Sequence, residues 1–573
     1  MSHHKKTHNY YKSFDSEKEQ INKKYNHYNK SSKSKTKYFS NNKKNDERVK
    51  HNNYSSDSEH KDNYSFEEIY KYYKYRLLTD NDLMVSGSNA YLNNYNNSGS
   101  NIQLTQSANI SNTSIKYNID YPYVGAPFYV RESGVYIVFF VISTDQPSQF
   151  CFYVNGMELS LTRCGNNTGA GQLVLRNMLQ LKKNDCVVIR NSMSTMSSVT
   201  SNLFFGGVLL GNDMTFLMMK IAPYEPLKCV EWDEKCLSKQ KNYLYKKLME
   251  KMLLDKELML KGFNIRGTFY TTTTQTVATE SDVVFDTQSN VNGLTWFYSS
   301  PSQIVVTEDG IYKIFFLGTN TVPLQLSLSI NGVPIDYTTQ GLNKGASQLT
   351  LRTIIELKKN DIISVKNHTS YNGSIVLSSN TGGVQLSLSA LLSVFKISPS
   401  CKSKLDVCEL NSYHKKSYDV FKNYLLNQKC LQIVGSPAYA TLSSDIVQKI
   451  DICNSYDWST TALQNNIHHN QGATTITINE DGIYDVFTDI LTNEPSQLAL
   501  FINETPEVST IFGRDSGGSR CLMRQFVKLL KGDIISVRNY ESYSGILTSG
   551  NNAGGNLVAQ NCLFMIFKLC GLD

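Results

Sequence analysis

Three segments of the chain repeat one alternation of apolar and polar positions. They run from Gly134 to Asn191, from Gly310 to Asn367 and from Gly482 to Asn539; each is 58 residues long, and they align without a gap. A unit of this length is a whole β domain, because the units of repeat solenoids are only about 20 to 50 residues long. The chain therefore contains three copies of one module, and any function must be built from that module.

Within each copy, short apolar or alternating runs are separated by Asn, Gly and Asp. In the second copy such runs include Leu349 to Leu357 and Ile362 to Val365. Strands about 8 to 12 residues apart with turn residues between them are typical of an all-β sandwich. Asn155-Gly156 and Asn331-Gly332 predict tight hairpins, whereas Asn503-Glu504 in the third copy is a weaker hairpin signal.

A helical periodicity precedes each β domain. Apolar residues recur at helical spacing in three sets: Phe66, Ile69, Tyr70, Tyr73 and Leu77; Leu237, Leu244, Leu248, Met252 and Met259; Tyr413, Val420, Phe421, Tyr424 and Leu425. This spacing predicts amphipathic helices. The repeating unit is therefore a helix followed by a β domain.

Net charge is confined to the start of the chain. Residues 1 to 65 hold 15 Lys and Arg against 8 Asp and Glu, which accounts for the net charge of +7 of the whole sequence. Their composition of Lys, Asn, Ser, His and Tyr is too polar to offset chain entropy, so we expect disorder. Contact with nucleic acid is unlikely on these grounds, because acidic residues dilute the positive charge; a solvated tether is the preferred interpretation.

No apolar run approaches the 18 residues of a membrane span, and the first residues lack the apolar core of a signal peptide. We therefore expect neither a membrane span nor secretion through a signal peptide. The twelve Cys do not pair by repeat, which favours a reducing compartment. Cys229 and Cys236 share a seven-residue spacing with Cys401 and Cys408, and whether these four form disulfides between segments stays open.

Two motifs suggest chemistry and are better explained by structure. Gly513 to Gly518 resembles the sequence around the nucleophile of trypsin-like proteases, but Arg514 interrupts it and no matching His segment lies upstream of Ser516. His468 and His469 are adjacent, so on a strand they point to opposite faces and cannot share a metal. We expect no catalytic residues, no metal and no cofactor, and the ligand-binding residues are unknown.

Sequons occur in several places, for example at Asn166, Asn367 and Asn503. They matter only if the chain meets a glycosylation system. Whether glycans are attached therefore stays open.

Three features together resemble a known family. These are a Gly-x-Tyr strand, a Lys-bearing turn that ends in Asp, and a closing apolar strand with one Lys. The residues are Gly134, Tyr136, Asp185 and Lys220; Gly310, Tyr312, Asp361 and Lys396; Gly482, Tyr484, Asp533 and Lys568. The pattern resembles the C1q/TNF-like jelly roll, most closely the domains at the C-terminus of spore-surface glycoproteins and in large-virus proteins. From the residues alone, we expect each Gly to permit a turn and each Tyr to lie in a core or interface.

The resemblance implies a mainly β fold of three tandem jelly-roll sandwiches that pack around a threefold axis, and it implies no catalysis. No collagen-like stalk precedes any copy, although such stalks are common in the family. With the periodicities above, it predicts these segments: 1–65 disordered basic tail; 66–84 helix; 85–222 first jelly roll; 223–266 helical connector; 267–399 second jelly roll; 400–433 helical connector; 434–573 third jelly roll.

Function is expected to be structural or recognition, without enzymatic activity. The three jelly rolls are predicted to assemble within one chain, with Tyr73, Leu244 and Phe421 facing inward; a homo-oligomer of three chains is the alternative. The family and the use of Asn, Lys, Ile and Tyr favour a component of a virion or particle surface with a protein or glycan partner. A receptor- or glycan-binding ligand and a spore-surface protein are the alternatives.

Overall fold

The computed structural model describes residues 64–80, 82–169, 171–201, 208, 212–225, 239–400, 412–428, 430–550, 556 and 559–572. Nearly all of the predicted tail lies outside these residues. So do Cys229, Cys236, Cys401 and Cys408. Of the described cysteines, Cys151, Cys164, Cys521 and Cys562 are buried and form no disulfide, and Cys570 is buried.

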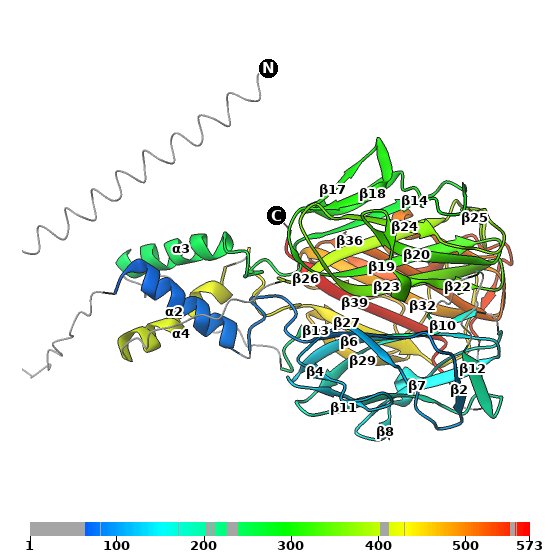
Figure 1. Cartoon of the computed structure of the whole chain (residues 1–573), viewed down its shortest axis with the longest axis horizontal. Helices are drawn as coiled ribbons and strands as arrows, with labels where there is room; N and C mark the ends of the chain where they lie inside the picture. Colours follow the sequence, from blue (N-terminus) through cyan, green and yellow to red (C-terminus); the bar gives the residue numbers. More distant parts are fainter. Residues whose placement is uncertain are drawn as a thin grey trace, which may run out of the picture. The chain divides into compact units, whose positions relative to one another are not determined.

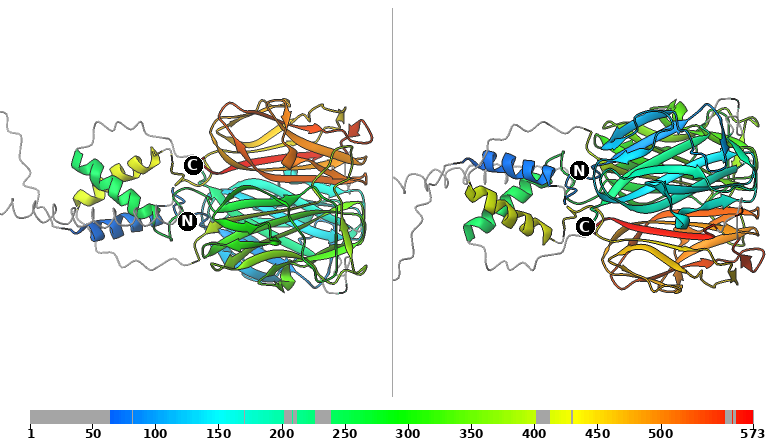
Figure 2. Two further views of the ribbon diagram at one scale, coloured as in Figure 1. Left: turned by 90° about the horizontal axis from the view of Figure 1, so that it is seen from above. Right: turned by 90° about the horizontal axis from the view of Figure 1, so that it is seen from below.

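Three helices lie together at one end of the β domains (Figures 1 and 2). They are α2 (Phe66–Thr79), α3 (Lys239–Leu253) and α4 (Ser412–Leu426). α2 begins where it does because Ser65 and Glu68 form a capping box, in which each side chain accepts a hydrogen bond from the other residue's backbone N–H. No described helix is both long enough and apolar enough to cross a membrane.

Aromatic side chains fill the space between the helices. Tyr73 and Phe421 are fully buried and stack with ring centroids 5.0 Å apart, as predicted. Leu244 was predicted to face inward with them, but it is only partly buried. Tyr245 takes the central place, because the buried face of α3 follows Tyr245, Leu248 and Met252 at helical spacing.

The described residues of the first β domain form these strands: β1 (Tyr91–Asn96), β2 (Ser100–Gln103), β3 (Asn112–Tyr117), β4 (Ile119–Asp120), β5 (Phe128–Val130), β6 (Gly134–Thr144), β7 (Ser148–Val154), β8 (Met157–Glu158), β9 (Cys164–Asn166), β10 (Gly171–Leu181), β11 (Cys186–Asn191), β12 (Ser198–Ser201) and β13 (Met214–Ala222). The second contains β14 (Arg266–Thr271), β15 (Gln275–Val277), β16 (Thr287–Asn292), β17 (Leu294–Phe297), β18 (Ser300–Val306), β19 (Gly310–Asn320), β20 (Leu324–Ile330), β21 (Val333–Pro334), β22 (Gln340–Leu342), β23 (Ser347–Leu357), β24 (Ile362–Asn367), β25 (Ile375–Leu377) and β26 (Ala390–Ser398). The third contains β27 (Tyr439–Ser444), β28 (Lys449–Ile450), β29 (Thr460–Asn465), β30 (Ile467–His468), β31 (Ile476–Ile478), β32 (Gly482–Thr492), β33 (Ser496–Ile502), β34 (Thr505–Pro506), β35 (Phe512–Arg514), β36 (Ser519–Leu529), β37 (Ile534–Asn539), β38 (Leu547–Thr548) and β39 (Cys562–Cys570).

Each β domain is a sandwich of antiparallel sheets, as predicted. In the first domain, one sheet has the order β2-β12-β6-β13-β1-β3 with β10 also paired to β6, and the other has the order β4-β5-β11-β7-β8 with β9 paired to β7. The second domain repeats both orders with β14 to β26. The third repeats them except that β28 and β38 form a separate pair. The sheet that contains β6, β19 or β32 is called the inner sheet below, and the other is the outer sheet.

The predicted hairpin turns form in all three copies. Asn331 and Gly332 have positive φ of 54° and 83°, which matches the right-handed twist of the flanking strands. In the third copy Asn503 and Glu504 adopt the same conformation, with φ of 48° and 69°. The weaker signal at Asn503-Glu504 therefore did not mean a different turn.

The Asp of each Lys-bearing turn holds two loops together. Asp361 accepts a hydrogen bond from the backbone N–H of Lys358 at 2.8 Å and another from the Asn331 side chain at 2.9 Å. Asp185 and Asp533 make the same pair of contacts in the other copies. The Asp therefore joins the turn before β24 to the hairpin after β20.

Replacing Asp361 with Ala should lower the free energy of unfolding by about 1–2 kcal/mol, because two exposed hydrogen bonds are lost. Thermal denaturation should show a fall of a few degrees in Tm. Asp336→Ala is the control, since Asp336 is an exposed Asp of the same domain. Equal Tm values for the two variants would show that the turn contacts are dispensable.

Candidate functional site at the junction of the three inner sheets

Hydrogen bonds between the segments that precede the β domains close a ring. Met84, Met259 and Gln432 occupy aligned positions three residues before Gly87, Gly262 and Gly435. The backbone N–H of each donates to a carbonyl of another segment: Met84 to Ile433 at 2.7 Å, Met259 to Val85 at 2.6 Å, and Gln432 to Leu260 at 2.7 Å. Each segment gives one bond and accepts one, so the ring is complete within one chain.

A second ring lies beside the first, at the ends of the closing strands. Ser88 donates to the Ile397 carbonyl at 2.6 Å, Phe263 to Leu569 at 2.8 Å, and Ser436 to Ile221 at 2.7 Å. The preceding glycines have φ of 72°, 73° and 76°. A Cβ on Gly87 would stand 2.2 Å from the Ile397 oxygen, so only glycine permits this approach.

A third ring joins loops of the β domains themselves. Val208 donates to the Thr369 carbonyl at 2.9 Å, Val384 to Glu541 at 3.0 Å, and Asn556 to Met193 at 3.0 Å. The donors occupy aligned positions in the three copies, and so do the acceptors. These bonds therefore connect the first domain to the second, the second to the third and the third to the first.

Gln side chains connect the inner sheets between these rings. Gln172 donates to the Thr350 carbonyl at 3.3 Å and accepts from the Thr350 N–H at 3.0 Å. Gln348, at the aligned position, makes the same pair of bonds with Leu522. The third copy has Arg520 there, which reaches the Gly165 carbonyl of the first copy at 3.1 Å.

Three arginines lie deep in this junction, on the long strands β10, β23 and β36. Arg176, Arg352 and Arg524 occupy aligned positions and are at most 3% exposed. Each pairs across its sheet with a Phe of the preceding long strand, at Phe139, Phe315 and Phe487.

Each of these guanidinium groups lies over phenyl rings, and one of the rings can belong to a neighbouring domain. Arg176 lies over Phe139 of its own domain at 4.4 Å and over Phe487 of the third domain at 4.1 Å, measured to the ring centroids. Arg352 lies 5.2 Å from Phe315 and 4.9 Å from Phe139 of the first domain. Such contacts attract a cation to the ring face.

Two residues before each Phe, the aligned positions differ. The first copy has Ile137, the second has Lys313 and the third has Asp485. Asp485 receives two hydrogen bonds from Arg524, at 2.9 and 2.8 Å, and lies 3.6 Å from Arg176. Lys313 stands 4.3 Å from the Phe139 centroid. Arg176, Lys313, Arg352, Arg524 and Asp485 are called the central charged cluster.

Burial governs the ionisation of this cluster. It lowers the pKa of Arg176 to about 9, although Asp485 opposes the change. Burial, with the neighbouring Arg524 and Arg176, holds the pKa of Lys313 well below its usual range. For Asp485, burial favours the neutral acid, but Arg524 outweighs it and the pKa is lowered.

The sequence pattern missed the cluster, although it contained a signal. Arg stands at the same place in GQLVLRNMLQL, SQLTLRTIIEL and SRCLMRQFVKL, within strands that are otherwise largely apolar. Repetition of a charged residue at a buried strand position in all three copies could have indicated a shared buried function.

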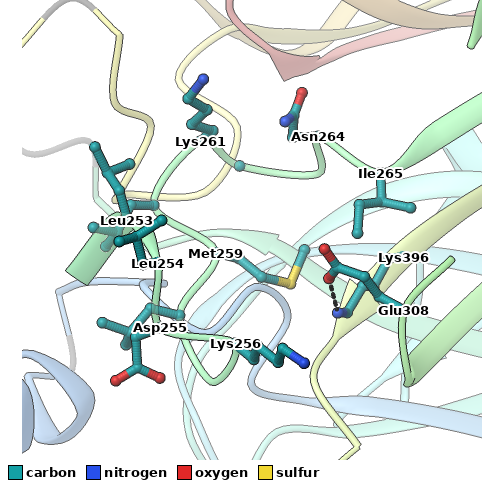
Figure 3. A pocket seen from close by; sticks show the side chains of 13 residues that line it. Leu253, Leu254, Asp255, Lys256, Met259, Lys261, Asn264, Ile265, Glu308 and Lys396 are labelled. Carbon is teal, nitrogen blue, oxygen red and sulfur yellow. Dashed lines mark hydrogen bonds and ion pairs between the residues drawn. The ribbon is translucent and has the colours of Figure 1, made fainter. Parts of the chain in front are cut away.

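The Gly-x-Tyr motif was partly misinterpreted. Tyr312 is fully buried, as expected, and donates to the Glu308 carbonyl at 2.8 Å. Gly310 was expected to permit a turn, but it lies within β19 and is absent from the positions of positive φ. Glycine is needed at this position for lack of space, because a Cβ there would stand 2.5 Å from Cε of Lys396. That Lys forms an ion pair with Glu308 at 2.9 Å beside a cavity of about 340 Å³ (Figure 3).

The other motifs that suggested chemistry serve structure. Ser516 donates to the Ala346 carbonyl of the second copy at 2.8 Å, so its hydroxyl lies between domains. His469 is buried between Thr461 and the Ala473 carbonyl, while His468 is exposed. Among the described residues, no three His, Cys, Asp or Glu side chains form a group that could hold a metal ion.

Among the sequons named above, Asn166 and Asn367 are buried, and their side chains donate to backbone carbonyls of their own domains. Asn503 is exposed, in the hairpin described above.

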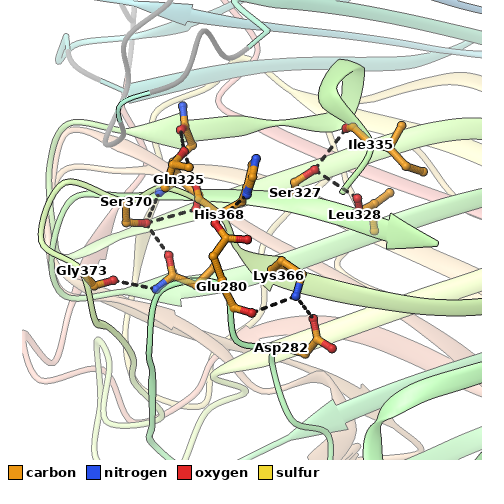
Figure 4. A network of polar contacts seen from close by, with 12 residues as sticks. Glu280, Asp282, Gln325, Ser327, Leu328, Ile335, Lys366, His368, Ser370 and Gly373 are labelled. Carbon is orange, nitrogen blue, oxygen red and sulfur yellow. Dashed lines mark hydrogen bonds and ion pairs between the residues drawn. The ribbon is translucent and has the colours of Figure 1, made fainter. Parts of the chain in front are cut away.

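A polar network lies on the outer sheet of the second domain (Figure 4). His368 contacts Glu280 at 2.8 Å, and Lys366 forms an ion pair with Asp282 at 3.4 Å. Ser370 accepts from the Gln325 N–H at 2.8 Å. These contacts hold the loop after β15 against β24. The polar groups named here are thus used in contacts with one another.

Comparison with solved structures finds similarity to the globular domain of the zebrafish complement 1qA protein, with 17% identity over 23% of this chain and 98% of that one, and a TM-score of 0.19. The Eiger TNF of S. frugiperda matches with 15% identity over 26% of this chain and 99% of that one, with a TM-score of 0.20. Rabbit GITRL matches with 10% identity over 24% of this chain and 97% of that one, with a TM-score of 0.16. No family model matches the chain, and no curated protein does.

One buried carboxylate at the start of β13 should respond to pH. Asp213 accepts hydrogen bonds through Oδ2 from Ser201 and Asn96, while Oδ1 has no hydrogen-bond partner among the described residues. Burial raises its pKa from 3.8 to about 6. Between these values the folded chain keeps a proton that the unfolded chain has released, so this group makes stability fall as pH rises from about 4 to about 6.

Replacing Asp213 with Asn should raise the free energy of unfolding at pH 7–8 by about 1–2 kcal/mol, because the cost of a buried charge is removed. The third copy has Asn561 at the aligned position, which indicates that Asn fits there. Urea denaturation at pH 4.5 and pH 7.5 should show the gain at the higher pH alone. Asp451→Asn, at an exposed Asp, is the control. A gain of equal size at both pH values would contradict the assignment.

Proposed function

We propose that this chain is a non-enzymatic structural or recognition protein built as a single-chain pseudo-trimer of C1q/TNF-like jelly rolls. The observation that carries the proposal is the closure of the three hydrogen-bond rings. In each ring the donors are aligned residues of the three copies, and every acceptor belongs to a different copy from its donor. A head-to-tail contact that closes after three units leaves none of these bonding positions for a further chain.

Packing of the inner sheets supports the same arrangement. Strand β23 contacts β1, β3 and β13 of the first domain, and β36 contacts β14 and β16 of the second. Leu463 of β29 lines a cavity together with Met178 and Leu179 of β10, which connects the third domain to the first. Each domain therefore uses one long strand to cover the inner sheet of a neighbour. Covalent linkage raises the local concentration of the copies, so assembly needs no partner chain.

Purified full-length protein should have the mass of one chain, 64.7 kDa, in multi-angle light scattering. The mass should not change when the protein is diluted tenfold, since the interfaces are intramolecular. A mass about three times larger would instead mean that copies from different chains assemble.

We propose further that the protein lies on the surface of a virion or other particle. The absence of any group arranged for catalysis at the described junction and the assembly of three compact sandwiches favour a surface or binding component. Tyr371 and Tyr543, at aligned positions in the second and third copies, are 56% and 62% exposed. An exposed Tyr repeated at one loop position favours the second candidate, a receptor- or glycan-binding ligand, because its ring offers apolar contact and its hydroxyl a hydrogen bond.

Immunogold labelling of intact purified particles should place the protein on their outside. Trypsin added to the same particles should cleave it without breaking the particle. Labelling that appears only after the particles are opened would overturn the surface location. A protein absent from particles that binds a cell surface or a glycan array would favour the second candidate.

A further inference from the structure

The central charged cluster carries an excess of positive charge. It contains four basic side chains, at Arg176, Lys313, Arg352 and Arg524, and one carboxylate, at Asp485. All five side chains are at most 3% exposed. Asp489, the other buried acid nearby, is already paired with Arg520 at 3.0 Å. Buried charge without a counter-charge is strongly unfavourable, so the basic groups must either lose protons or gain a counter-charge.

Hydrogen-bond donors of the cluster are also unfilled. Both oxygens of Asp485 are occupied by Arg524. All three guanidinium nitrogens of Arg176 lack a hydrogen-bond partner among the described residues; so do Nζ of Lys313, Nε and Nη1 of Arg352, and Nη1 of Arg524. Buried donors in native proteins are nearly always satisfied by protein, water or a bound ion.

Three of the side chains with unfilled donors lie around one phenyl ring. Arg176, Lys313 and Arg352 all lie over the ring of Phe139, at 4.4, 4.3 and 4.9 Å from its centroid. They come from different domains, the first from β10 and the other two from β19 and β23. The phenyl face attracts cations but carries no full charge, so it compensates only part of the excess.

We propose that a small inorganic anion, a halide such as chloride, binds between Arg176, Lys313 and Arg352 at the junction of the domains. The anion would supply the second domain with the negative charge that Asp485 supplies in the third. Arg524 has its carboxylate in the same copy, whereas the corresponding position beside Arg352 is Lys313, a second basic side chain. These side chains are at most 3% exposed, and a single-atom ion needs less room among them than an oxyanion does.

Crystals of the full chain soaked in bromide provide the direct test. Anomalous scattering should show a bromide within about 3.5 Å of nitrogen atoms of Arg352 and Lys313, the range of a hydrogen bond to a halide. Bromide found only on the surface would overturn the proposal, and so would sulfate at this place in crystals that also contain halide.

Stability in solution provides an independent test. In sodium chloride and sodium gluconate mixtures of constant ionic strength, Tm should rise by about 1–3 °C for each tenfold increase in chloride above the Kd. Sulfate should not replace chloride. A Tm that depends on ionic strength alone would contradict a bound halide; it would fit a neutral Lys313 with no anion.

Lys313→Ile tests the assignment to these residues. The first copy has Ile137 at the aligned position, so the variant should fold, and circular dichroism checks that it does. It should lose at least half of the chloride-dependent rise in Tm and the bromide peak should weaken. The control is Lys359→Ile, which removes an exposed lysine in the same domain. Equal chloride dependence in the two variants would overturn the site.

Discussion

The mutual covering of the three inner sheets is the constraint on which the rest of the structure depends. Val135, Phe139, Phe315, Leu391 and Phe567 belong to one hydrophobic cluster that runs through all three domains. The first and second sandwiches also have clusters of their own between their inner and outer sheets, so each of those two domains has a local core and a shared one. A domain taken alone would expose its residues of the shared cluster to water, and soluble monomers rarely expose large apolar patches.

Covalent linkage lets this junction be asymmetric. In three identical chains, every residue near the axis occurs three times, so one buried Lys means three buried Lys and one buried Asp means three Asp. Here the aligned positions hold Ile137, Lys313 and Asp485, while Arg176 and its two counterparts are retained. The third copy alone can therefore supply the carboxylate that pairs with Arg524. The same freedom replaces the bridging Gln of two copies with Arg520, which then pairs with Asp489.

Features determined by neighbours in sequence were predictable from the chain. Strand alternation, the Asn331-Gly332 hairpin and the capping role of Asp361 all depend on residues of one sandwich, and the structure has them as expected. The steric reason for glycine at position 310 was not predictable in this way. Its constraint comes from Lys396, which lies 86 positions later in the sequence, and a turn is the more common reason for a glycine beside an acidic residue. Leu244 was assigned inward because spacing fixes a helix face only to within one residue, and the aromatic Tyr245 fills the centre better.

The central charged cluster was beyond prediction for a related physical reason. An Arg within an apolar strand, seen in one copy, can be placed at a sheet edge or at a surface where its charge meets water. Only the contact between domains makes that position interior, and only the three-dimensional arrangement brings Lys313 of one copy beside Phe139 of another. Burying this charge weakens the junction unless it is compensated, yet truncating a single member would leave its partners uncompensated and weaken it further. The cluster therefore favours the one arrangement in which its charges meet. If two domains exchanged places, Lys313 or Asp485 would contact the wrong neighbours. The cluster therefore distinguishes the order of the three domains around the junction, which apolar packing alone does not do.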